Sequence, residues 1–267
     1  MNVELTERVE RIATDDRHGG SWLAKEAVEA VVEAARLGED PLATARRIVA
    51  AKPGIGAIAG ALGRLLLAGR TPEQLVEEAN ALITGRERAA AAIAVLLSQE
   101  LREKVVMTHS ASATAREALL HAQPARVVCT VSEPTGEGRE FSEELAAAGL
   151  TTELVADDDA EHAVGSVQIL LLGADTIFRD GSLLNKAKTN GLTKAAKKAG
   201  IPVIVACEVL KLAPDDPIQP DDERVELTPP DQLDRIVTEE GEFVAEEISV
   251  LIDRTPFLNE GYELLRG

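Results

Sequence analysis

The pattern of hydrophobic and polar positions changes near residue 102. Before that point, apolar residues recur at three- and four-residue spacing in segments such as SWLAKEAVEAVVEAARLG (21–38), which is the period of a helix with one buried face. Ser21, Asp40 and Thr71 are expected to cap helices, and a proline follows two of them, as suits a first helical turn. We therefore predict a helical domain over residues 1–102.

After residue 102, short β-rich runs alternate with helical stretches. The runs are KVVMTH, RVVCTV, TTELVA, VQILLL and PVIVAC. Such alternation indicates parallel strands joined by right-handed crossovers, and uninterrupted apolar runs indicate a sheet covered on both faces. The predicted fold class is α/β: an N-terminal helical bundle followed by a Rossmann-like doubly wound parallel sheet over residues 103–267, with the helix that ends near Leu101 as the bridge.

Polar residues follow each predicted strand, at the edge where doubly wound sheets bind ligands. The acids Asp157–Asp159 could either cap a helix or bind a ligand. Asp175 follows the fourth strand, and the next helix starts only near Thr189, so this acid has no helix to cap and is expected to face a pocket. The other candidates at this edge are His109, Ser110, Ser112 and Glu133.

Histidines and cysteines show no metal-binding spacing, so we expect no metal and no cofactor. Cys129 and Cys207 lie in strand-like runs and are expected to pack as small apolar residues. A catalytic triad of Ser110, His109 and Asp175 is disfavoured, because adjacent residues of a strand point to opposite faces.

The charge balance is strongly acidic, with 46 Asp and Glu against 28 Lys and Arg and a net charge of −18. With 2% aromatic residues, it indicates adaptation to high salt, where self-repulsion is screened; an ordinary acidic protein is the alternative. A basic stripe is missing, which disfavours direct nucleic-acid binding. No apolar run approaches about 18 residues and no signal pattern opens the chain, so we expect a cytoplasmic protein without membrane partners.

The segment GADTIFRDGSLLNKAKT (173–189), with VVMTHSASAT (105–114) and TVSEPTGEGREFSEELAAAGL (130–150), resembles a known family. It is the family of the alpha, beta and delta subunits of translation initiation factor 2B, which also contains methylthioribose-1-phosphate isomerase and ribose-1,5-bisphosphate isomerase. The resemblance covers nearly the whole chain. It implies an N-terminal helical domain, a C-terminal Rossmann-like domain and a homodimer.

The resemblance also implies a site. In the isomerases, a cysteine after the first strand and the aspartate of the GAD motif move protons between C1 and C2 of an aldose 1-phosphate. Asp175 matches that aspartate, and Asn185 and Lys186 match a pair that helps to hold substrate. Ser110 stands at the cysteine position; a thiol with an ordinary pKa of about 8.5 exchanges protons near neutrality, whereas an unaided hydroxyl does not. Glu133 stands where the isomerases typically carry arginine, and Lys188 replaces a common glycine.

Two functions follow from these matches and departures. One is a non-catalytic, initiation factor 2B subunit-like regulatory or binding protein, with the alpha subunit of initiation factor 2 as a candidate partner. Its pocket would bind a phosphosugar or nucleotide through His109, Ser110, Ser112, Glu133, Asn185 and Lys186. The alternative is an aldose–ketose isomerase that acts on a sugar 1-phosphate through Asp175.

Overall fold

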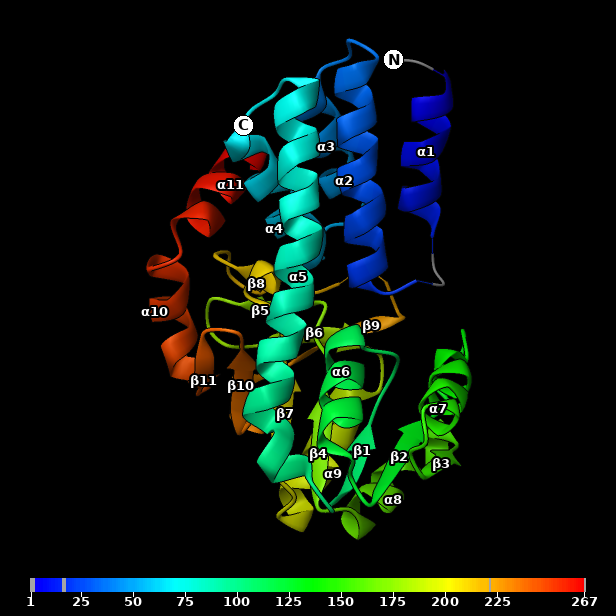
Figure 1. Cartoon of the computed structure of the whole chain (residues 1–267). Coiled ribbons are helices and arrows are strands. Elements are labelled where there is room, and N and C mark those ends of the chain that lie inside the picture. Colours follow the sequence, from blue (N-terminus) through cyan, green and yellow to red (C-terminus); the bar gives the residue numbers. More distant parts are fainter. Residues whose placement is uncertain (1–2, 16–17, 221, 267) are drawn as a thin grey trace.

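The first part of the chain is a bundle of long helices. The structure, a computed structural model, describes residues 3–15, 18–220 and 222–266. The five helices are α1 (Val3–Thr14), α2 (Gly20–Arg36), α3 (Pro41–Ala51), α4 (Gly56–Ala68) and α5 (Pro72–Leu101) (Figure 1). None of the described helices combines the length and the apolar character needed to cross a bilayer.

Two of the three predicted helix caps are present. The Asp40 side chain accepts from the amide of Leu42, and Thr71 forms a capping box with Gln74. The prediction for Ser21 is wrong, because α2 begins one residue earlier and its N-cap is Gly19, which has no side chain to cap with. Ser21 therefore lies inside the first turn of α2.

All five predicted strands occur in one sheet of seven strands, in the order β11-β10-β7-β4-β1-β2-β3. Every neighbouring pair is parallel except β10 and β11. The strands are β1 (Val105–Thr108), β2 (Arg126–Thr130), β3 (Thr152–Val155), β4 (Ile169–Leu172), β7 (Val203–Ala206), β10 (Arg235–Thr238) and β11 (Gly241–Phe243). The sequence patterns did not predict β10 and β11.

Helices cover both faces of this sheet, as a doubly wound fold requires. Adjacent strand residues belong to different cores: Val106 packs with helices on one face, and Met107 packs with helices on the other. The first face carries the end of α5 together with α6 (Ala113–Ala122) and α7 (Glu137–Ala147). The second carries α8 (Ala160–Ala163), α9 (Thr189–Ala199) and α10 (Ile248–Asp253). Helix α5 thus bridges the bundle and the sheet, as predicted.

A second, four-stranded sheet that was not predicted lies between the bundle and the main sheet (Figure 1). Its order is β8-β5-β6-β9, and the strands are β5 (Thr176–Phe178), β6 (Leu183–Lys186), β8 (Leu212–Ala213) and β9 (Val225–Thr228). Strands β5 and β6 form a hairpin that turns at Gly181, whose φ is 85°. Phe178 packs into the core of the bundle and its neighbour Ile177 into that of the main sheet.

Helix α11 (Pro256–Arg266) returns from the sheet to the bundle and packs beside α4. Its residues Tyr262 and Leu265 are part of the core of the bundle. The division into residues 1–102 and 103–267 remains a prediction. Helix α11 falls within the second of these ranges, although it packs against helices of the first. The helices α4 and α11 meet at two glycines, and a Cβ atom on Gly63 would lie 2.8 Å from Cα of Gly261.

The glycine contact predicts a large effect of one methyl group. Gly63→Ala should lower the free energy of unfolding by about 1–3 kcal/mol, because the new methyl group would clash with the backbone of α11, which cannot move aside as a flexible side chain could. The matched control is Gly85→Ala in α5, where a Cβ atom has open space and the higher helix propensity of alanine should add about 0.5–1 kcal/mol. Urea unfolding of both variants is the measurement, and equal effects would contradict the packing argument.

Candidate ligand-binding site

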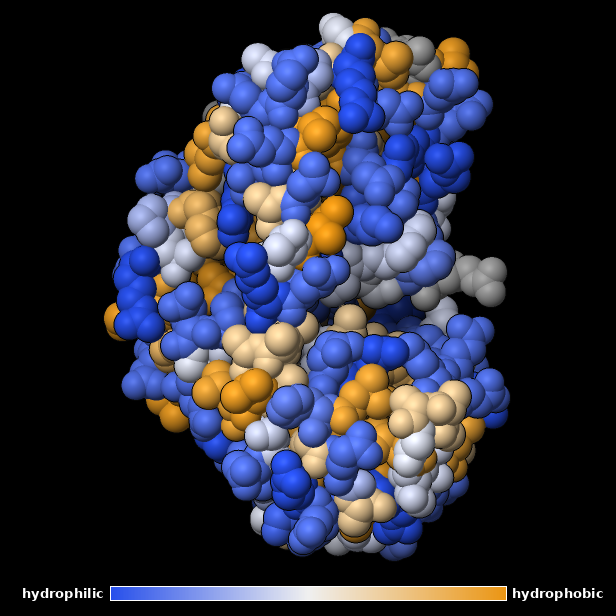
Figure 2. All heavy atoms as spheres, in the orientation of Figure 1, coloured by the Kyte–Doolittle hydropathy of each residue, from blue (hydrophilic) through white to orange (hydrophobic). Residues whose placement is uncertain are grey.

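A cavity of about 1010 Å³ lies between the bundle and the carboxyl ends of the main-sheet strands. The molecular surface is hollowed between these two parts (Figure 2). Segments from both parts line it: the loop before α2, the loop before α4, the segments after β1 and β4, the end of β6 and the loop before β9. This is the sheet edge at which ligands were predicted.

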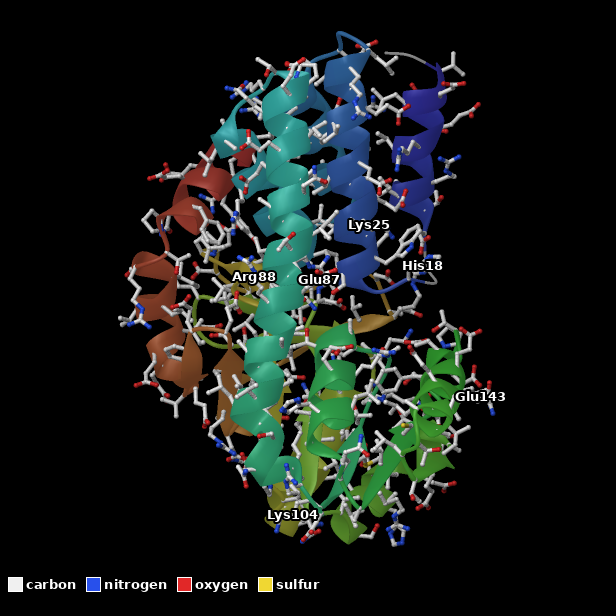
Figure 3. All side chains as sticks on the ribbon, in the orientation of Figure 1. His18, Lys25, Glu87, Arg88, Lys104 and Glu143 are labelled. Atoms are coloured by element: carbon white, nitrogen blue, oxygen red, sulfur yellow. The ribbon has the colours of Figure 1, made fainter. Side chains whose placement is uncertain are left out.

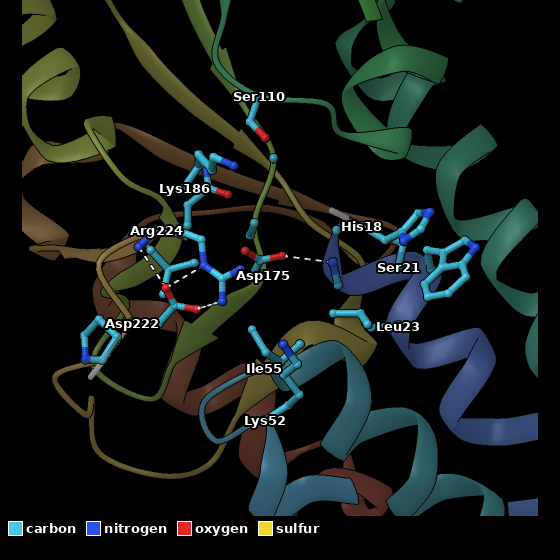
Figure 4. A pocket seen from close by; sticks show the side chains of 18 of the residues that line it. His18, Ser21, Leu23, Lys52, Ile55, Ser110, Asp175, Lys186, Asp222 and Arg224 are labelled. Carbon is cyan, nitrogen blue, oxygen red and sulfur yellow. Dashed lines mark hydrogen bonds and ion pairs between the residues drawn. The ribbon is translucent and has the colours of Figure 1, made fainter. Parts of the chain in front are cut away.

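Asp175 lies at the centre of the cavity wall, held by the bundle (Figure 4). Its Oδ1 accepts from the amide of Gly20 at 3.2 Å, and its carbonyl accepts from the amide of Ala57 at 3.4 Å. Burial raises the pKa of Asp175 above the ordinary value of 3.8, although Lys211, the Gly20 amide and Lys186 oppose the rise. Burial therefore makes the ionised form of this carboxyl group costly.

Ser110 follows β1 with a φ of 65°, the left-handed region that costs a non-glycine residue about 1 kcal/mol. Its amide donates to Oγ of Ser132 at 2.9 Å, and its own hydroxyl donates to Oε1 of Glu137 at 2.9 Å. The Ser110 hydroxyl lines the cavity beside a carboxylate, not beside a histidine.

His109 is buried and both of its ring nitrogens are used within the protein. Nε2 donates to the carbonyl of Ala187 at 2.8 Å, so Nδ1 accepts from Oγ1 of Thr130 at 2.7 Å. Burial lowers the pKa of His109, which keeps the ring neutral. The ring thus joins the end of β1 to β2 and to the segment after β6, and its nitrogens bond to Thr130 and Ala187 instead of to Ser110 and Asp175, the partners that a triad would require.

Ser112 and Asn185 line the cavity and also serve the fold. Ser112 caps α6 by accepting from the amide of Ala115 at 3.2 Å. A Cβ atom on Gly173 would lie 2.3 Å from its hydroxyl, which explains the glycine of the GAD motif. Asn185 is nearly buried, and its Nδ2 donates to Oγ1 of Thr189 at 3.4 Å.

Lys186 reaches into the cavity and binds Glu137, a residue that the sequence patterns did not single out. Its Nζ lies 2.9 Å from Oε1 of Glu137 and donates to Oγ1 of Thr135 at 2.8 Å. Glu137 also accepts from Thr135. The Lys186 ammonium, which the resemblance assigns to substrate, thus has a carboxylate of the protein as its partner.

Glu133 and Lys188 lie outside the set of residues that line the cavity. Glu133 is exposed before a cis proline, and its carboxylate lies 3.5 Å from Nη2 of Arg139. Lys188 has a φ of 75°, which accounts for the glycine expected there, and its Nζ lies 2.9 Å from Oδ1 of the exposed Asp158. The geometry therefore does not bring these two side chains to the other candidates.

Asp157 is not among the described residues that line the cavity, and its side chain caps no helix of the described chain. Its carboxylate accepts from the amides of Ser132 and Glu133, both at 2.7 Å. It therefore holds the loop between β2 and α7 that precedes Glu137.

An aromatic pair stands at the rim of the cavity, on the bundle side. The rings of His18 and Trp22 stack with their centroids 3.8 Å apart, and Nδ1 of His18 lies 2.8 Å from Oδ2 of Asp15. Figure 3 shows His18 at the foot of the bundle, while Lys104 lies at the far end of the sheet. Trp22 is 39% exposed and lines the cavity together with His18, so the bundle side contributes aromatic surface.

Behind Asp175, a buried ionic group ties the sheet to the bundle. Arg86 of α5 binds Glu208 at 2.8 Å and donates to the carbonyl of Ser21 at 2.9 Å. Lys211 is 4% exposed and its Nζ donates to the carbonyl of Ala174 at 2.8 Å. Burial alone would raise the pKa of Glu208, but Lys211 and Arg86 outweigh it and hold that pKa below its usual range.

Cys129 and Cys207 are buried and unbridged, and burial raises the pKa of Cys129 to about 11. Cys207 lies behind the cavity next to the buried ionic group: its Sγ donates to the carbonyl of Glu208 at 3.4 Å, and burial raises its pKa. Within the described residues, no three His, Cys, Asp or Glu side chains are grouped to hold a metal ion.

The raised pKa of Asp175 predicts a gain in stability when its charge is removed. A raised pKa in the folded state contributes stability below the ordinary 3.8 and loses it as the pH rises through the folded pKa. Asp175→Asn, which still accepts from Gly20, should therefore be more stable than the wild type at pH 7, with the gain shrinking as the pH falls toward 3.8. Urea unfolding against pH measures it.

Asp158→Asn is the control of opposite sign. The hydrogen bond from Lys188 lowers the pKa of Asp158, so this group contributes stability above 3.8 that is lost on acidification. Its replacement should bring no gain at pH 7. A gain equal to that of Asp175→Asn would show that net charge, not burial of Asp175, is responsible.

Comparisons with known proteins agree with the fold and its resemblance. The family model described as "Initiation factor 2 subunit family" matches residues 7–257. A ribose 1,5-bisphosphate isomerase of Haloferax volcanii is 29% identical over 247 residues, covering 79% of this chain and 76% of the relative. A translation initiation factor eIF-2B subunit 2-like protein of Pyrococcus horikoshii is 30% identical, covering 79% and 81%.

Among solved structures, the crystal structure of the Pyrococcus horikoshii OT3 translation initiation factor eIF-2B superposes with a TM-score of 0.81 at 25% identity. The match covers 91% of this chain and 98% of that one. With its helical bundle, doubly wound sheet and a family model that spans nearly all of it, the chain belongs to the initiation factor 2 subunit family.

Proposed function

We propose that this chain is an initiation factor 2B subunit-like regulatory or binding protein that lacks isomerase activity and binds a small polar ligand in its cavity. The observation that carries the proposal is Ser110. It stands where the resemblance places a catalytic cysteine, and its hydroxyl donates to the Glu137 carboxylate. A hydroxyl held in this way has no pKa near neutrality with which to pass a proton between two carbons.

The second candidate is a sugar-phosphate isomerase. Relatives of the chain bear both names, isomerase and initiation factor subunit. The observation that favours the isomerase is Asp175, whose carboxyl lines the cavity with a raised pKa beside Asn185 and Lys186. A carboxyl group with a raised pKa is suited to general acid–base work.

Assays with ribose 1,5-bisphosphate and methylthioribose 1-phosphate separate the two candidates. They should be run in dilute buffer and in molar KCl, because we also propose that this acidic chain works at high salt. The wild type should show no turnover above the blank. Turnover that Asp175→Asn abolishes would contradict the proposal.

Restoring the missing group provides a positive arm. Ser110→Cys alone should stay inactive, because the adjacent Glu137 carboxylate raises the pKa of a thiol. Ser110→Cys combined with Glu137→Gln leaves Lys186 to favour the thiolate, and should raise turnover about 100-fold over the blank, the size of a general acid–base contribution. Adding Asp175→Asn should remove that gain.

For partners, we propose a homodimer that binds the alpha subunit of initiation factor 2. Light scattering of the purified chain should give twice the mass of 28.4 kDa, and a pull-down at matched ionic strength should retain the alpha subunit. A monomer, or clean absence of binding in both low and high salt, would contradict this part of the proposal.

A further inference from the structure

Glu137 occupies a position built for an anion. It is the first residue of α7, where the dipole of the helix favours negative charge. Three donors converge on its carboxylate: Nζ of Lys186 at 2.9 Å, Oγ of Ser110 at 2.9 Å and the hydroxyl of Thr135. An ammonium and two hydroxyls at the edge of a parallel sheet are a donor set that suits a phosphate, and here the protein fills it with its own carboxylate.

The other cations of the cavity are also committed to the protein. Among the described residues, Lys52 donates to the carbonyl of Asp15, Lys211 to that of Ala174, and Arg224 pairs with the carboxylate of Asp222. The described lining carries five carboxylates against four cations: Asp15, Glu137, Asp175, Asp222 and Glu223 against Lys52, Lys186, Lys211 and Arg224. A phosphate, with a charge near −2 at pH 7, would have to displace an ion pair, because the described lining has no surplus of cations to receive it.

Uncharged hydrogen-bonding groups and ring or alkyl surface make up the remaining wall. Ser110 lies on the sheet side and Ile55 on the bundle side (Figure 4). Ser112 and Asn185 also line the cavity from the sheet side, and Trp22 lines it from α2 of the bundle. Carboxylates accept from hydroxyls, and a ring or alkyl wall packs against the carbon face of a sugar. The cavity therefore matches a ligand that offers many hydroxyls and no charge.

We propose that Glu137 sets the specificity of the cavity for an unphosphorylated polyhydroxyl ligand, of the class of a free pentose, and against its phosphate esters. The inference rests on the proposed function, in that it takes the cavity to be a ligand site of a non-catalytic protein. It replaces the phosphosugar or nucleotide that the resemblance implies with an unphosphorylated sugar.

Trp22 provides the measurement, because it is the single tryptophan of the chain and lines the cavity. Its fluorescence is titrated with ribose, ribose 5-phosphate and ribose 1,5-bisphosphate, and calorimetry checks each result. In the wild type, affinity should fall with each added phosphate. In Glu137→Gln, affinity for both phosphate esters should rise about tenfold or more, the effect of returning one charge-assisted hydrogen bond to the ligand, while ribose should bind no more tightly.

Glu140→Gln is the matched control. It removes the same charge from the same helix, on an exposed residue outside the described lining. It should leave the three affinities in their wild-type order. An equal gain for phosphate esters in this variant would reduce the Glu137 effect to net charge and overturn the proposal.

Three other results overturn it: a wild type that prefers the bisphosphate to ribose, a Glu137→Gln variant with an unchanged order, or no binding of any of the three sugars. The wild-type order decides even if Glu137→Gln does not fold, which its thermal transition will show. Turnover is read separately. If the wild type prefers ribose but catalyses isomerisation, the proposed function is wrong and the proposed specificity stands. If the wild type is inactive but prefers the bisphosphate, the proposed specificity is wrong and the proposed function stands.

Discussion

The close approach of the helical bundle to the sheet edge is the constraint on which the site depends. The amide of Gly20 reaches the carboxylate of Asp175, and the amide of Gly56 donates to Oγ1 of Thr176 at 2.6 Å. A Cβ atom on Gly20 would lie 2.9 Å from the Asp175 carboxylate, and one on Gly60 would lie 2.0 Å from the carbonyl of Leu210. Glycines at these positions thus let the helical bundle approach the sheet closely, and the cavity is the space left at the edge of this contact.

Much of the fold was predictable because its main elements are long or uninterrupted. The apolar runs that became β1, β2, β4 and β7 are buried on both faces, and such strands leave a clear mark in a sequence. Strands β5, β6, β8 and β9 have two to four residues each and take their order from pairing with distant segments. Residues 212–213 carry no local pattern that could place them beside β5.

The site was predicted unevenly, and the reason is geometric. His109, Ser110, Ser112 and Asp175 share one cavity because the carboxyl ends of the parallel strands β1 and β4 meet at one edge. Asn185 and Lys186 line the same cavity from the end of β6, which belongs to the second sheet. Glu137, at the start of α7, lines the cavity in place of Glu133. The course of the loop between β2 and α7 depends on the two Asp157 hydrogen bonds and on positive φ at Ser132 and Gly136. Neither these hydrogen bonds nor these backbone angles can be predicted from the segment SEPTGEG. An acid at the start of a predicted helix could, however, have drawn attention to Glu137.

Helix α11 is the last element of the described chain, yet it packs in the N-terminal bundle, which affects how the bundle folds during synthesis. The first five helices leave the ribosome long before residues 256–266 exist, and chains in general fold from the N-terminus as they emerge. The core of this bundle is incomplete at that stage, since it includes Tyr262 and Leu265, and Gly261 meets Gly63. The side of α4 that α11 covers in the folded protein stays uncovered until residues 256–266 are made, so loss of these residues should destabilise the N-terminal half.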